Sequence, residues 1–235
     1  MKKFILGLLA VFILLSGCAS TEKEGPGQNG KAPLFGMIYS TDSTPVSGAL
    51  VTLDMKQTAQ TDINGRFFFN KVSIGDHTVG IKKDGFEEAL IDLNFLNRDM
   101  VLYASLVSLE DILDDLENTL KSGRINEAKI LVERAEKIDA HSIRLRYLKV
   151  VFLSKIKKYA DALLEIENLR ALYPEDPYLV MTKAEILFHG LGRVEAAIDI
   201  LRNSDQCGRN EELGTLLKKI ASEWEDSEAG GEMNE

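Results

Sequence analysis

The fold is decided where the chain reads Ser108-Leu109-Glu110-Asp111-Ile112-Leu113-Asp114-Asp115-Leu116-Glu117-Asn118-Thr119-Leu120. Before this stretch, apolar residues alternate with polar ones or form short β-branched runs. Within it they recur at the three- and four-residue spacing of an amphipathic helix. Ser108 and Asp111 also have the spacing of a capping box, which marks the start of a helix. The sequence therefore predicts an α+β chain of two domains, with strands before Ser108 and helices after it.

Upstream of Ser108, short apolar runs are separated by turn residues at intervals typical of a small β-sandwich. Turn signals include Asn64-Gly65, the strongest short hairpin signal, and Asp84-Gly85. We expect an antiparallel sandwich over residues 33–107. The expected strands are 34–40, 49–55, 66–72, 77–82, 86–93 and 100–107.

The turns of this region share their sequence motifs and the order of these motifs with a known domain. They are Gly36-Met37-Ile38, Pro45-Val46-Ser47-Gly48-Ala49-Leu50-Val51, Thr61-Asp62-Ile63-Asn64-Gly65-Arg66-Phe67, Gly75-Asp76-His77-Thr78-Val79 and Lys83-Asp84-Gly85-Phe86. In this the region resembles the carboxypeptidase regulatory-like domain. The resemblance implies a prealbumin-type sandwich of seven strands and no catalysis, because that family's zinc ligands belong to a different domain.

Within one of these turns, Asp62 can accept backbone N–H bonds, and Phe67 and Phe69 are expected to point inward together. Asp62 and Asn64 also have the spacing of calcium ligands. No closing bidentate acid follows at the right distance, so we interpret the segment as a structural turn.

Downstream of Ser108, pairs of helical patterns recur every 34 residues. Ala128, Ala162 and Ala196 mark the repeat. Paired helices at this period resemble the tetratricopeptide repeat, with units over 109–142, 143–176 and 177 to about 204. The resemblance implies that the three alanines sit where the two helices of each unit approach closely. An irregular helical bundle is the alternative.

The end of the chain predicts one more helix and then a tail. Leu213, Leu216, Leu217, Ile220 and Trp224 form an apolar stripe suited to a helix that caps the last repeat. We therefore expect a helical solenoid over residues 108–224. Residues 225–235 are acidic and are expected to be disordered.

The N-terminus has the layout of an export signal. Lys2 and Lys3 precede an apolar run that ends at Leu15-Ser16-Gly17-Cys18. This segment resembles a bacterial lipoprotein signal, which implies cleavage before Cys18 and acylation of that residue. We expect a signal peptide over 1–17, a lipidated flexible tether over 18–32, and an anchor in the cell envelope. A membrane-spanning helix is the alternative, but the apolar run is shorter than the roughly 20 residues that a span needs.

Ala19 after Cys18 resembles the pattern that sends lipoproteins to the outer rather than the inner membrane. Lipidation of Cys18 would leave Cys207 without an internal disulfide partner. Cys207 is then a small residue at a helix end, a free thiol or a link to another protein.

Charge and motifs exclude several classes of function. The chain has a net charge of −9, and removal of residues 1–17 with their two lysines makes it more acidic. The overall charge therefore disfavours nucleic acid and anionic lipid as partners, and nucleic acid is not expected. His77, His141 and His189 are not at metal-ligand spacing, and no phosphate-binding, nucleophile or dinucleotide motif occurs. We expect no enzyme activity, no catalytic residue, no cofactor and no metal.

The remaining candidate is the face that lines the groove of tetratricopeptide repeats. The resemblance implies that an envelope protein of unknown identity binds there, so that the chain acts as an adaptor or scaffold. A surface that only packs internally is the alternative. The candidate residues, carried over by position, are Glu117, Arg144, Tyr147, Val151, Lys155, Tyr178, Met181, Glu185 and His189.

A second hypothesis assigns binding to the β domain. Domains of this shape bind sugars, so the domain could hold glycan or peptidoglycan while the repeats act as a spacer. Aromatic side chains would form the platform. The candidates are Tyr39, Phe68, Phe86 and Tyr103.

Overall fold

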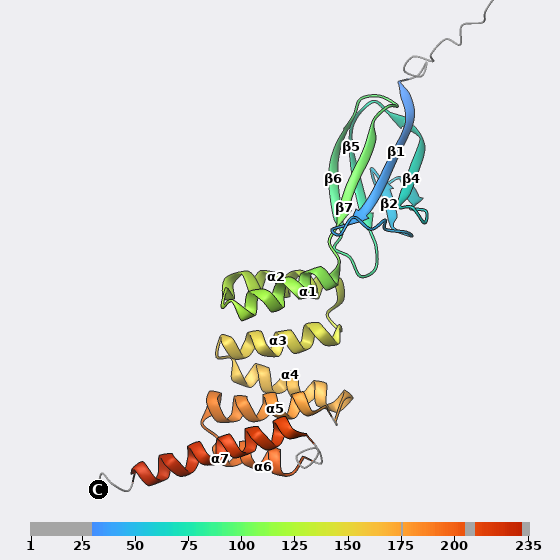
Figure 1. Ribbon diagram of the computed structural model, residues 1–235. Helices are drawn as coiled ribbons and strands as arrows, with labels where there is room; N and C mark the ends of the chain where they lie inside the picture. The colour runs from blue at the N-terminus through green and yellow to red at the C-terminus, as the bar shows by residue number, and fades with distance from the viewer. Residues whose placement is uncertain (1–29, 175, 205–209, 232–235) are drawn as a thin grey trace, which may run out of the picture.

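The computed structural model describes residues 30–174, 176–204 and 210–231, with side chains described up to residue 224. The predicted signal peptide, Cys18, the tether up to residue 29 and Cys207 lie outside the described residues. Figure 1 shows an elongated molecule with a β domain at one end and layered helices at the other. The chain enters the β domain at the end far from the helices.

The β domain has seven strands in its described residues, arranged in two sheets that share one core. One sheet has the order β4-β1-β7 and the other β3-β2-β5-β6. The bounds are β1 Lys31–Ser40, β2 Leu50–Leu53, β3 Gln57–Gln60, β4 Arg66–Ser73, β5 Gly75–Lys82, β6 Ala89–Phe95 and β7 Val101–Leu106.

Alternation positions the core residues of each strand. In β1, Leu34 and Ile38 point inward and are fully buried, whereas Phe35 points outward and is about half exposed. Phe67 and Phe69 are both buried, which confirms the prediction that they point inward together. Pro33 lies where the β1–β4 register shifts. This suits a residue that cannot donate to the ladder of a central strand.

The pairing differs from the sequence prediction in three ways. Strand β1 pairs with β7 in parallel, so the expectation of a purely antiparallel domain was wrong. The Asn64-Gly65 turn joins β3 to β4 across the two sheets rather than closing a hairpin between paired strands. Strand β3 was not predicted, because its sequence Gln57-Thr58-Ala59-Gln60 is a short polar edge strand without a hydrophobic pattern.

The turn that joins the sheets is held by local hydrogen bonds. Asp62 Oδ1 accepts the backbone N–H groups of Asn64 and Arg66 at 2.9 and 2.8 Å, which confirms the predicted role of Asp62. Gly65 has φ +73°, and a Cβ there would lie 2.4 Å from the Ile38 carbonyl oxygen. Glycine is therefore required at this position on two grounds.

Three helix pairs and a final helix follow. Their bounds are α1 Leu109–Lys121, α2 Ile125–Asp139, α3 Ile143–Lys155, α4 Tyr159–Leu172, α5 Pro177–Glu185, the π-helical turn η1 Ile186–Gly190, α6 Val194–Arg202 and α7 Glu211–Gly231. The first helices of the pairs start after Ser108, Ser142 and Asp176, N-caps that are 34 residues apart. The predicted capping box of Ser108 with Asp111 is present in both directions.

The 34-residue period fails in the third pair. At the start of the second helix of each pair, the fully buried alanine is Ala128, Ala162 or Ala197, whereas Ala196 is exposed, so the assignment of Ala196 was wrong. The extra residue lies between the N-cap Asp176 and the start of α6, where η1 interrupts the α-helix. A π turn adds one residue to a helix, which accounts for the shift.

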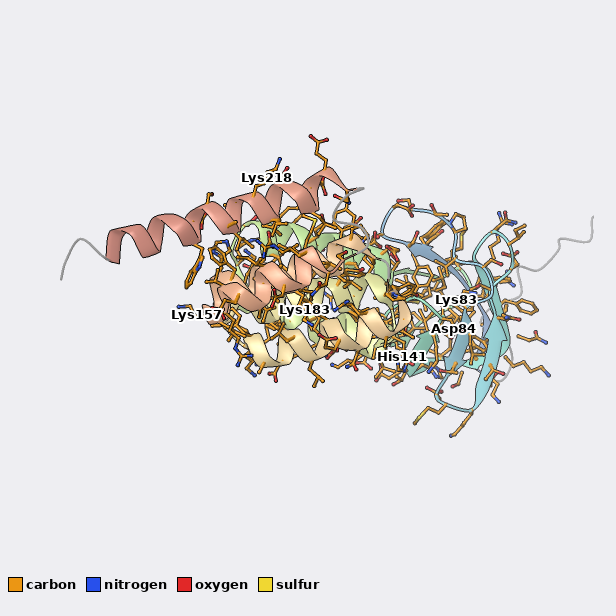
Figure 2. All side chains as sticks on the ribbon, turned by 90° about the horizontal axis from the view of Figure 1, so that it is seen from below. Lys83, Asp84, His141, Lys157, Lys183 and Lys218 are labelled. Carbon is orange, nitrogen blue, oxygen red and sulfur yellow. The ribbon has the colours of Figure 1, made fainter. Side chains whose placement is uncertain are left out.

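The last helix closes the stack and extends further than expected. Leu213, Leu216 and Ile220 of α7 pack with residues of α5 and α6 in one hydrophobic cluster. Figure 2 shows Lys218 on the side of α7 that faces away from the other helices. The backbone of α7 is helical to Gly231, beyond residue 224, where the capping helix was expected to end. Acidic residues alone do not end a helix, because glutamate has a good helix propensity.

Candidate functional site

The nine candidate groove residues lie on the first helices of the three pairs. Glu117 is on α1, and Arg144, Tyr147, Val151 and Lys155 are on α3. Tyr178, Met181 and Glu185 are on α5, and His189 is in η1. Each of the four α3 residues has a counterpart 34 residues later, in α5 or η1. The one-residue shift does not affect the three counterparts in α5, because η1 begins only after α5 ends. We call the face that these nine residues define the repeat face.

Arg144 is engaged inside the repeat face. Its guanidinium forms ion pairs with Glu110 at 2.8 Å, with Asp114 at 2.5 Å and with Glu117 at 3.1 Å, all on α1. The hydrogen bond to Asp114 contributes most to raising the pKa of Arg144. Arg144 therefore ties α3 to α1 and is not free to meet a carboxylate of a partner.

Glu117 and Tyr147 are engaged as well. Glu117 binds Lys121 and Arg144, and the Lys121 hydrogen bond is the main cause of its lowered pKa. The Tyr147 hydroxyl donates to Asp176, the N-cap of α5. Burial and this bond raise the pKa of Tyr147, and its ring packs against the helical core. The two residues connect successive pairs.

The rest of the repeat face is accessible. Val151 and Tyr178 are 39% and 61% exposed, and Lys155, Glu185 and His189 are also exposed. Met181 is partly buried. The His189 ring packs edge-on against Phe188, with ring centroids 4.6 Å apart. The accessible part therefore runs from the end of α3 along α5 and combines apolar, aromatic and charged side chains, a mixture found in protein-binding surfaces.

The β domain contacts the helices at a different place. Glu87 accepts two hydrogen bonds from Arg134 of α2, at 3.0 and 2.7 Å. The hydroxyl of Thr41 donates to Asp111 at 2.6 Å. Leu109 N–H donates to the Gly85 carbonyl at 2.8 Å. These described contacts involve α1 and α2, so they do not cover the α3–α5 part of the repeat face.

A hollow of about 550 Å³ lies at this junction, lined by residues 82–88 with Lys137 and Ile138 of α2. Figure 2 shows Lys83 and Asp84 together on its β side. Its lysines are matched by acids in the same loop, with Lys82 bound to Glu88. The hollow therefore has no single charge that would select a ligand.

The aromatic candidates of the β domain fall into two groups. Phe68 and Tyr103 are 60% and 64% exposed on the outer side of the β4-β1-β7 sheet. Tyr39 and Phe86 are partly buried, and Phe86 packs on the β core. Sequence reasoning missed Phe35, which faces Phe68 across the β1–β4 ladder. The alternation of β1 around Leu34 could have indicated it.

Asp54, His77 and Ser73 form an arrangement that superficially matches a hydrolase triad. His77 Nδ1 lies 2.7 Å from Asp54 Oδ2, and Nε2 lies 3.3 Å from Ser73 Oγ. Nε2 also lies 2.8 Å from the Ser73 carbonyl oxygen, which can only accept. With both ring nitrogens donating, the imidazole has no lone pair for the Ser73 hydroxyl, so it cannot act as a base in this geometry.

This cluster is instead a structural ion pair. Burial lowers the pKa of His77, but the Asp54 and Ser73 hydrogen bonds outweigh it and leave the pKa above its ordinary value. The Thr78 N–H and His77 lower the pKa of Asp54. Both groups are therefore stabilised in their charged forms, and they fasten the β2–β3 turn to β5.

No group of three or more His, Cys, Asp or Glu residues in the described ranges could hold a metal ion. Among the same residues, no helix has both the length and the apolar character needed to cross a membrane.

Comparison with known proteins found similarity only among solved structures. No protein family and no curated protein matches the chain. A type II cohesin–X-dockerin complex from Acetivibrio cellulolyticus matches 35% of this chain and 70% of its own, at 22% identity and a TM-score of 0.29. For the major pilin subunit of Bacillus cereus, the match covers 33% of this chain and 28% of the pilin chain, at 14% identity and a TM-score of 0.27.

A proposed carbohydrate-binding protein from Bacteroides uniformis matches 33% of this chain and 42% of its own, at 16% identity and a TM-score of 0.27. Scores of this size establish neither the fold nor the function of the chain. The architecture of the β domain therefore rests on its strand pairing and on the core that its two sheets share.

Proposed function

We propose that this chain is a lipid-anchored protein of the bacterial cell envelope that binds another protein through its repeat face. The observation that carries the proposal is the accessible strip of α3 and α5, formed by Val151, Lys155, Tyr178 and Glu185 with the neighbouring His189. In this proposal the β domain is a sandwich of the carboxypeptidase regulatory-like kind and the helices are tetratricopeptide-like repeats. Cys18 carries the lipid, and the chain performs no catalysis.

Three of the candidate residues already contact other helices of the chain. Arg144, Glu117 and Tyr147 hold the helices to one another, so the contact surface shifts toward α5. Tyr178 is the best candidate for an anchor. It is an exposed tyrosine, a residue type enriched among those that dominate binding energy.

Site-specific cross-linking in the native envelope tests the proposal. A photoreactive amino acid replaces Tyr178 in one variant and Leu164 in another. Leu164 is a matched control, because it is 64% exposed and lies on α4, outside the repeat face. We expect a defined cross-linked protein from position 178 and none from position 164.

A charge reversal completes the test. Lys155→Glu in the position-178 variant should weaken the cross-link, because it reverses a charge within the accessible strip. Equal products from positions 178 and 164, or no product from 178, would contradict the proposal. Substitution of Arg144 or Tyr147 would not be informative, since their contacts hold successive helix pairs together.

A further inference from the structure

The outer side of the β4-β1-β7 sheet carries four exposed apolar or aromatic side chains, Phe35, Phe68, Val101 and Tyr103, and the partly buried Met37. Phe35 lies opposite Phe68 on one side and Val101 on the other. The next row holds Met37 beside Tyr103. The Phe35 and Phe68 rings stack with centroids 6.2 Å apart and an angle of 28°. We call these five residues the aromatic face.

These side chains do not contribute to the core. Alternation sends Leu34 and Phe67, the chain neighbours of Phe35 and Phe68, into the shared core instead. The outward positions of the other sheet are mostly polar, as expected for a solvated face. They include Thr52, Thr58, Gln60, Asp92 and Asn94, and the apolar exceptions are Leu50 and Leu90. A contiguous exposed apolar patch on only one of two sheets indicates a contact surface.

The charged side chains on the strands of this sheet are all basic. Lys31, Arg66 and Lys71 are exposed on the same three strands. Among the described residues of β1, β4 and β7 there is no Asp or Glu, although the whole chain has a net charge of −9. A surface that combines aromatic rings with cations is complementary to a bilayer with acidic lipids, because the rings can enter the apolar boundary while the cations meet the anionic headgroups.

The path of the chain places a bilayer within reach. Strand β1 begins at Lys31, about 13 residues after Cys18. That length spans at most about 45 Å at ~3.3–3.6 Å per residue. Figure 1 shows that the chain enters the molecule at the β domain rather than at the helices. A lipid on Cys18 would therefore hold the aromatic face close to the membrane.

We propose that the aromatic face lies on the surface of an anionic bilayer, with Phe35 and Phe68 in the headgroup region and Lys31 and Arg66 against lipid phosphates. The proposal uses the lipid anchor of the proposed function only to explain proximity. A sugar ligand fits less well, because specific small-ligand sites place several polar groups to orient the ligand, and Phe35 is flanked across the sheet by the apolar Phe68 and Val101. A single weak patch of this kind gives reversible binding, which suits a second contact beside an acyl chain.

Vesicle sedimentation of the chain from residue 19 onward, which keeps all described residues and lacks the lipidation site, tests this inference. The vesicles contain either phosphatidylcholine alone or phosphatidylcholine with about one third phosphatidylglycerol. We expect binding to the anionic vesicles that weakens with salt. The double variant Phe35→Ser/Phe68→Ser should bind at least about tenfold more weakly, since the apolar area of two rings is lost.

Two further variants complete the design. Leu90→Ser is the matched control, because Leu90 is 77% exposed on the other sheet, and its binding should equal that of the unaltered chain. Arg66→Gln should weaken binding to anionic vesicles roughly fivefold, the effect of one cation near a charged membrane, and should leave binding to neutral vesicles unchanged. Circular dichroism confirms that each variant is folded.

Several results would overturn the inference. These are no binding to anionic vesicles, equal binding by the double variant, or equal loss in Leu90→Ser. Binding to cell-wall sacculi that the double variant loses, without vesicle binding, would assign the face to glycan. A dimer in sedimentation velocity that the double variant loses would assign it to a second copy of the chain. Cross-linking from position 178 does not depend on the aromatic face, so the two proposals can fail separately.

Discussion

The one-residue shift at the third helix pair leads to a prediction that distinguishes the position buried in the structure from the position that the 34-residue period indicates. The 34-residue spacing from Ala162 points to Ala196, whereas the structure buries Ala197 completely and leaves Ala196 exposed. Replacing each alanine by leucine separates the two assignments. Leucine has a helix propensity close to that of alanine, so the intrinsic contribution of the helix is nearly constant between the variants.

The expected magnitudes follow from the surroundings. Ala197 packs within the cluster of α5, α6 and α7, where three added carbons have no room without displacing neighbours. Overpacking of this kind costs about 1–3 kcal/mol of unfolding free energy. Ala196→Leu adds its carbons in solvent and should change stability by less than about 0.5 kcal/mol. With a urea dependence of ~2 kcal/mol per molar, Ala197→Leu should lower the midpoint by about 1 M.

Urea unfolding followed by far-ultraviolet circular dichroism measures the stability of the helical part of the chain. Ala162→Leu serves as the positive reference, because Ala162 is also fully buried and occupies the corresponding position of the second pair. A larger loss in Ala196→Leu than in Ala197→Leu would refute the reasoning. It would mean that the π turn does not shift the register of α6.

Three further perturbations test other parts of the structure. His77→Gln should remove a pH dependence of stability. The pKa of His77 lies above 6.5 in the folded chain, so the stabilisation by His77 is complete below pH 6.5 and is lost as the pH rises through the folded pKa. Thermal unfolding between pH 5.5 and 8 would detect this loss in the unaltered chain and its absence in the variant. Thr61→Val should cost about 1–3 kcal/mol in urea unfolding, because the buried hydroxyl bridges the Val46 carbonyl and the Ala49 N–H. Arg134→Leu should change stability by less than about 1 kcal/mol, as its pair with Glu87 is partly exposed. It should nevertheless alter the domain arrangement, seen as a changed radius of gyration in solution scattering, and an unchanged value would show that other contacts set that arrangement.

Local signals predicted the start of the helices well. Ser108 with Asp111 carries its capping chemistry in the immediate sequence, and the predicted cap is present. The inward direction of Phe67 and Phe69 was predicted equally well, because alternation along one strand needs no knowledge of its neighbours.

Signals that depend on distant parts of the chain were missed. The four residues of β3 have no hydrophobic pattern and become a strand only because β2 offers an unpaired edge. The parallel partner of β1 is β7, which no local turn connects to it. The shift in α6 depends on a π turn for which the sequence carries no simple periodic signal.

That the repeat face binds a partner stays a prediction. The repeat offset assigned the nine residues to the first helices of the pairs, and eight of them lie on α1, α3 and α5, whereas His189 lies in η1. It did not indicate that Arg144 would meet three carboxylates of α1, since those acids lie about 30 residues earlier in the chain. The aromatic face was likewise only half recognised, because Phe35 and Phe68 become neighbours through sheet pairing.

By itself, the sequence determined where strands give way to helices, where each first helix begins, and which side of each element is apolar. These properties depend on spacing within a few residues, and caps and alternation express them directly. Only the tertiary structure decided which strands pair, which alanine is buried in the third helix pair, and which charged residues are already engaged. Each of these depends on groups that meet across long sequence distances, and a repeat period carries such information only as long as no residue is inserted.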